Sequence, residues 1–121
     1  MTTLTEGRHP GEFLLSEAKG TRSRETGTLI SGQNLQAGTV LGQITASSKL
    51  TQYNKDAANG SQAVFGVLFD NVDASAGDVT GVVYIARDAE VKKGALQWIN
   101  AGNETAGTPG LKSLGIIVRN K

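Results

Sequence analysis

Apolar and polar positions alternate in short runs along most of this chain, and the first two runs lie close together. Gly27–Ser31 and Thr39–Thr45 are rich in residues that favour β-strands. In the second run Val40 and Ile44 fall on one side of a strand with a period of two. Glycines begin and end the connection Gly32–Gly38, where each can adopt the positive φ that strains other residues. The pattern predicts a β-hairpin at the entrance to a β-rich domain.

Further strands are predicted along the rest of the chain, at Lys49–Tyr53, Ala63–Phe69, Val79–Ala86, Asp88–Val91 and Leu111–Arg119. Ala63–Phe69 is apolar on both faces, which is typical of a central strand, and Gly66 within it indicates a bulge or a close backbone approach. We expect Asp88–Val91 to continue the strand that precedes it. About seven short strands at this spacing predict an all-β protein, with a compact barrel- or sandwich-like body and little helix.

The region before the last strand is mostly polar. Lys92-Lys93-Gly94 predicts a turn, and Leu96 and Trp98 then share one face of a strand or of a single helical turn. Asn100–Pro109 predicts a polar loop, which a turn at Pro109-Gly110 closes.

The first residues of the chain lack this patterning. We therefore divide the chain into a flexible N-terminal arm, residues 1–24, and a β-rich domain, residues 25–121. The arm contains one apolar trio, Phe13–Leu15, just after a break at Pro10-Gly11. Free in solution, residues 1 to about 20 should be mobile, because they have no periodic apolar face to offset the cost of ordering. The exposed trio suggests an arm that becomes ordered on a partner.

Composition narrows the possible functions. The net charge of +1 is evenly spread, and no basic stripe or aromatic platform indicates nucleic acid binding. Aromatic residues make up only 5% of the chain, so the core of a monomer would be small and an oligomer is favoured. The chain has no cysteine, which excludes disulfides and thiolate sites. No apolar run is long enough for a membrane span, and the N-terminus lacks the pattern of a signal peptide, so we expect no membrane partner.

We expect no catalytic residues, no metal site and no cofactor. The only histidine, His9, lies in the arm, where nothing holds it beside a target as a general base must be held. Asp70, Asp73 and Asp78 do not have the spacing of a calcium loop and are more typical of turns. Asp88 and Glu90 share a strand face, but no second pair completes an acid–base set.

Several motifs, in order along nearly the whole chain, resemble those of bacteriophage head decoration proteins, the lambda-type capsid stabilisers. No single motif is decisive, and the ordered series carries the resemblance. The motifs are His9-Pro10-Gly11-Glu12-Phe13, Ser23-Arg24-Glu25, Gly27-Thr28-Leu29, Gly38-Thr39-Val40-Leu41-Gly42, Ala63-Val64-Phe65-Gly66-Val67-Leu68, an acidic turn with Asp73, Ala86-Arg87-Asp88-Ala89-Glu90-Val91, and Leu114-Gly115-Ile116-Ile117-Val118-Arg119.

This resemblance implies a structural virion protein without enzymatic activity. Such proteins form homotrimers on the outer surface of the expanded capsid, where they bind the major capsid (coat) protein and stabilise the shell against internal DNA pressure. The expected location is the virion, after assembly in the host cytoplasm. By analogy the arm grips the coat protein, and the residues expected to do so are Glu12, Phe13, Leu14, Leu15, Ser23 and Arg24.

A second class of function remains open. The segment Gln33–Gly42 also looks like sequences of β-clip or biotinyl-carrier domains, and a small β-sandwich could recognise another protein or a carbohydrate. A carrier domain needs a modifiable lysine beside a methionine at a hairpin tip, but Met1 is the only methionine. A sugar-binding domain needs exposed aromatic residues, and the candidates are Tyr53, Tyr84 and Trp98.

Overall fold

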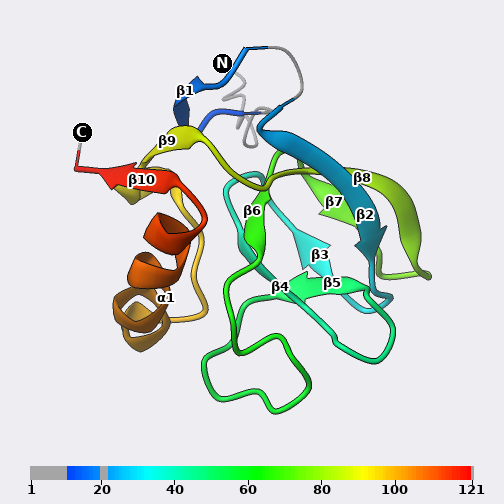
Figure 1. Ribbon diagram of the computed structural model, residues 1–121. Coiled ribbons are helices and arrows are strands. Elements are labelled where there is room, and N and C mark those ends of the chain that lie inside the picture. The colour runs from blue at the N-terminus through cyan, green and yellow to red at the C-terminus, as the bar shows by residue number, and fades with distance from the viewer. Residues whose placement is uncertain (1–10, 20–21, 121) are drawn as a thin grey trace, which may run out of the picture.

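A closed barrel of five strands forms the centre of the protein (Figure 1), and its strand order is β2-β5-β4-β6-β8. The computed structural model describes residues 11–19 and 22–120. The barrel strands are β2 (Arg24–Leu29), β4 (Val40–Gln43), β5 (Leu50–Gln52), β6 (Gly66–Leu68) and β8 (Val79–Ile85). Leu29, Leu41, Leu50 and Leu68 are almost fully buried within it. The predicted β-rich, barrel-like fold is confirmed.

The predicted hairpin is wrong, although both of its strands exist. β2 pairs with β5 and β8, and β5 therefore lies between β2 and β4. The connection between them contains a strand of its own, β3 (Asn34–Leu35), which pairs with β7 (Val72–Asp73). Because β3 takes a distant partner, the connection does not act as a hairpin turn. The positive φ expected at both of its glycines is present, at +92° for Gly32 and for Gly38.

β6 occupies the central position that its apolar faces predicted, between β4 and β8. The strand is shorter than predicted, since Ala63–Phe65 lie outside it. The close approach expected at Gly66 is confirmed: a Cβ there would lie 2.7 Å from the carbonyl oxygen of Ile85 and 2.7 Å from Cδ2 of Tyr84. Only glycine allows the strands β6 and β8 to approach this closely.

A second sheet of three strands lies beside the barrel, in the order β1-β9-β10. β1 (Leu14–Glu17) runs antiparallel to β9 (Ala89–Lys92), and β10 (Ile116–Arg119) runs parallel to it. β9 was expected to continue β8. It instead begins a new sheet, because the chain turns at Asp88, whose φ is +54°.

The expected loop at Asn100–Pro109 is instead the first part of a helix, α1 (Ala101–Ser113), so the last strand begins only at Ile116. The side chain of Asn100 caps the helix by accepting a hydrogen bond of 3.0 Å from the backbone N–H of Asn103. Asn103, Gly107 and Leu111, four residues apart, form its buried stripe. A short 3-10 helix, η1 (Lys93–Ala95), occupies the turn predicted near Lys93.

The second sheet and α1 enclose a core that continues into the barrel. Phe13 from the N-terminal segment, Val91 from β9 and Leu111 from α1 are fully buried there with Val40 and Ile85 of the barrel. The N-terminal segment is therefore positioned by the same core that joins the two parts of the protein.

Candidate functional site

The N-terminal segment, residues 11–19, lies against the folded body. The backbone N–H of Gly11 donates a 2.8 Å hydrogen bond to the carbonyl oxygen of Phe69, and the N–H of Lys92 donates one of 2.7 Å to the carbonyl of Phe13. Leu14 of β1 is then opposite Val91 of β9. The segment is thus an integral strand of the second sheet in this structure.

Phe13 lies in the turn that precedes β1, and Leu15 lies in the strand itself. Phe13 is completely buried, whereas 41% of Leu15 is exposed. β1 is also an edge strand, because the sheet order places β9 on one side of it and no other described strand on the other side. Among the described residues, the segment therefore has an open strand edge and an exposed apolar side chain.

A cluster of three side chains joins the end of β1 to the start of the barrel. The carboxylate of Glu17 accepts hydrogen bonds from Arg24 Nε at 3.1 Å and from an Arg24 terminal nitrogen at 2.5 Å, and a further bond from the hydroxyl of Ser23. The Arg24 guanidinium, helped by Ser23, holds the pKa of Glu17 below its usual value although partial burial opposes this, and Glu17 in turn raises the pKa of Arg24. We call Glu17, Ser23 and Arg24 the Glu17 cluster.

A second set of contacts fixes the chain around this cluster. The carbonyl oxygen of Ser23 accepts a 2.7 Å hydrogen bond from the N–H of Ala86. The guanidinium of Arg87 donates to the carbonyl oxygen of Arg22 at 2.6 Å and to the carboxylate of Glu25 at 2.7 Å. Residues 22–25 are therefore held on the connection between β8 and β9.

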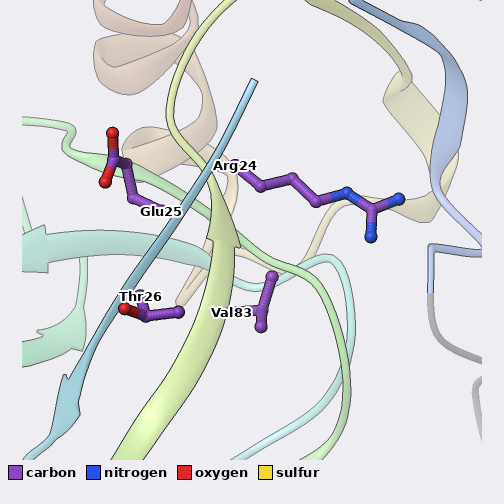
Figure 2. Close-up of a pocket in the computed structure, with 4 residues that line it drawn as sticks. All are labelled: Arg24, Glu25, Thr26 and Val83. Atoms are coloured by element: carbon purple, nitrogen blue, oxygen red, sulfur yellow. The ribbon is translucent and has the colours of Figure 1, made fainter. Parts of the chain in front are cut away.

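A shallow pocket of 310 Å³ lies beside the cluster, lined by Arg24, Glu25, Thr26 and Val83. Figure 2 shows the side chains of Arg24 and Glu25 on opposite sides of β2, as neighbouring residues of a strand must lie. The guanidinium carbon of Arg24 is 4.1 Å from the centre of the Phe69 ring, close enough for a cation–π contact. The lining of the pocket thus combines cationic, anionic and apolar groups.

The structure separates the residues expected to bind a partner into two groups. Ser23 and Arg24 are brought together through Glu17, and Glu12 and Leu15 are exposed. Phe13 is completely buried in the core and is inaccessible while the segment stays in place, whereas Leu14 packs against that core and is half-buried. The division into an arm and a domain at residue 24 stays a prediction, as does the anchoring role of Phe13. Residues 1–10, which were expected to be mobile, lie outside the described residues.

Sequence reasoning missed three residues of this surface: Glu17, Phe69 and Arg87. Glu17 and Arg24 have opposite charges seven positions apart, which is a weak signal because no helix or hairpin links them. Phe69 was assigned only to a strand face. Its contact with Arg24 depends on tertiary packing, for which the local pattern contains no signal.

The acidic residues examined as metal ligands have separate local partners. Asp70 and Asp73 accept hydrogen bonds from the N–H groups of Asn71 and Ser75, as turn residues do. Asp78 accepts from the N–H of Ser31 and forms an ion pair with Lys49. Within residues 11–19 and 22–120 there is no group of three or more potential metal ligands. His9 lies outside the described residues.

The fold and this surface define a small β-barrel protein with an open sheet edge beside a cluster of ion pairs. A family model described as bacteriophage lambda head decoration protein D matches residues 3–116, and the chain belongs to this family. No curated protein matches the chain significantly. The family is structural and belongs to the phage capsid, so the chain is a virion protein. In the part of the chain described, no helix is long and apolar enough to cross a membrane.

Proposed function

We propose that this protein binds the outer surface of the expanded phage capsid as a homotrimer and stabilises the shell against internal DNA pressure. Its partner is the major capsid protein, and the protein performs no catalysis and binds neither nucleic acid nor a membrane. Assembly takes place in the host cytoplasm. Membership of the head decoration family supports the capsid as the partner.

The observation that carries the proposal is the open edge of β1. An edge strand has unpaired backbone N–H and C=O groups, to which an extended segment of another protein can add as a further strand. Within residues 11–19 and 22–120, β1 has this geometry, and the exposed Leu15 on it provides an apolar contact. The coat-protein segment would therefore continue the second sheet of the decoration protein.

The arm expected at residues 1–24 can act in either of two positions. In its described position it uses the edge of β1 and Leu15, while Phe13 fixes the segment to its own domain. If the segment leaves the folded body, Phe13 becomes an anchor on the coat protein. Phe13 then loses its burial in the core of its own domain, which costs about 1.5–3 kcal/mol. The position described here avoids that cost, and we favour it.

Co-sedimentation with expanded and with compact capsid shells tests this proposal. The wild-type protein should sediment with expanded shells, and Leu15→Ser should weaken that binding, because it removes the apolar contact without altering the core. Ile99→Ser is the matched control, since Ile99 is the other large apolar side chain exposed in the described residues, at 47%. Equal binding of Leu15→Ser and the wild type would contradict a role for this edge, and equal binding to both shell types would contradict specificity for the expanded form.

A further inference from the structure

Two adjoining pockets share no lining residue with the N-terminal segment or with the Glu17 cluster. The first has a volume of 260 Å³ and is lined by residues of β3, by Gln52 of β5, and by Gln97 and Trp98. The second has a volume of 270 Å³ and also includes Gln52, together with Ile99. Because they share Gln52, and because Trp98 and Ile99 are consecutive, we treat them as one surface, the amide surface.

The amide surface carries no charge. None of the residues lining either pocket is Asp, Glu, Lys or Arg, although these residues make up 19% of the chain. A phosphate, a carboxylate or an ammonium ion would lose its hydration here without gaining an opposite charge. The lining therefore favours a neutral ligand.

Four side-chain amides of the first pocket are available for such a ligand. Within the described residues, the side chains of Asn34, Gln36, Gln52 and Gln97 form no hydrogen bond with the protein. Each amide contains two N–H donors and a carbonyl acceptor. This mixture matches hydroxyl groups, which also donate and accept hydrogen bonds.

Trp98 adds an apolar wall to the same pocket. Its ring packs edge-on against Tyr53, with 6.0 Å between the ring centres, and a Cβ at Gly107 would lie 2.4 Å from it. The ring is thus held in place from two sides, and it needs little further ordering to contact a ligand. Its indole N–H is buried without a hydrogen-bond partner in the described structure, so its resonance should respond to changes in the pocket.

We propose that the amide surface is a binding site for a neutral oligosaccharide. Sugar hydroxyls would bond to the four free amides, and the apolar C–H face of a sugar ring would lie against Trp98. The adjoining second pocket would extend the site to a further sugar unit. This site is separate from the capsid contact and would leave capsid binding unchanged.

Nuclear magnetic resonance titration of the full-length protein tests the site, with maltohexaose and fully N-acetylated chitotetraose as neutral probes. We expect saturable shifts of the Trp98 indole signal and of the side-chain amide signals of Gln52 and Gln97. Gln52→Ala or Gln97→Ala should weaken binding about tenfold, as the loss of one or two hydrogen bonds would. Asn120→Ala is the matched control, because it removes an exposed amide that lines neither pocket, and it should bind like the wild type.

Three results would overturn the proposal. One is the absence of saturable shifts with both probes up to their solubility limits. Another is equal affinity of the wild type and both glutamine variants. The third is slow solvent exchange of the four side-chain amides in the free protein, which would show that a second copy of the chain already covers them.

Discussion

Glu17 connects the N-terminal segment to the barrel through side chains from both. Its carboxylate accepts bonds from Ser23, which is fully buried, and from Arg24, which also contacts the ring of Phe69. The side chain of Glu17 is only 17% exposed, so solvent screens this pair less than the exposed ion pairs of the chain. This carboxylate thus adds a side-chain attachment at the end of β1 to the backbone pairing of that strand with β9.

Glu17→Gln should make thermal stability less dependent on acid pH. Because its folded pKa lies below the ordinary value of 4.5, ionised Glu17 contributes stability above that value, and the contribution is lost as pH falls through the folded pKa. Between about pH 5 and about pH 3, the melting temperature of the wild type should therefore fall more than that of Glu17→Gln. Calorimetric scans across this range measure the difference.

Asp56→Asn provides the control, since the side chain of Asp56 is 74% exposed and pairs only with its neighbour Lys55. Its pH profile should follow that of the wild type. Parallel profiles for the wild type and Glu17→Gln would show that the Glu17 cluster does not stabilise the protein.

The secondary-structure elements differ in how well their local sequence patterns predicted them. The strands were predictable because a period of two indicates one buried face, as in Ala89–Lys92, and a continuous apolar run indicates two buried faces, as in Gly66–Leu68. Helix α1 was not predictable from its pattern, because its buried stripe consists of Asn103, Gly107 and Leu111. Of these three residues only Leu111 has a large apolar side chain. Pro109 within the helix and its three glycines also favour a loop.

Strand partners were less predictable than strands. The pairing of β2 with β5 and β8 depends on contacts between segments far apart in sequence, whereas glycine spacing favoured a local hairpin. The same limit applies to the candidate site. Ser23 and Arg24 were predicted as site residues. The burial of Phe13 was not, because it depends on packing against β9 and α1, which the sequence of Phe13–Leu15 does not indicate.

Helix α1 provides a test in which propensity and packing oppose each other. Gly→Ala within a helix normally stabilises it by about 0.5–1 kcal/mol. At Gly107, however, the new Cβ would lie 2.4 Å from the Trp98 ring and 2.9 Å from Tyr53. We expect Gly107→Ala to lower the free energy of unfolding by roughly 1–3 kcal/mol, because the core would be overpacked.

Gly102→Ala is the matched substitution on the exposed side of the same helix, where the nearest atoms are 3.4 Å away. It should leave stability unchanged or raise it slightly. Urea unfolding of both variants measures the two free energies, and a stabilising Gly107→Ala would show that the Trp98 ring moves aside at little cost.

At the scale of the whole molecule, one continuous core joins the barrel to the second sheet. Phe13, Val91 and Leu111 pack with the barrel residues Val40 and Ile85, so the two parts share one core. Large apolar side chains exposed in the described residues are limited to Leu15 and Ile99.

Sedimentation equilibrium should give a trimer, with three times the chain mass of 12.6 kDa, at micromolar concentration. Family membership and the small aromatic content support this expectation. Leu15→Ser should sediment as the wild type does, because Leu15 is assigned to the capsid contact. A stable monomer at this concentration would contradict the trimer without affecting the proposed use of the β1 edge.

The position of β1 in its sheet also determines when it can fold. Its partner β9 follows it by more than half the chain, so β1 leaves the ribosome long before that partner exists. β1, the first of the described strands, is then among the last to be placed, since closing so long a loop is slow. Elements attached at one edge also tend to open before the rest of a protein unfolds. Hydrogen exchange at β1 should therefore be faster than in the barrel, and equal protection of the two would show that they open only together.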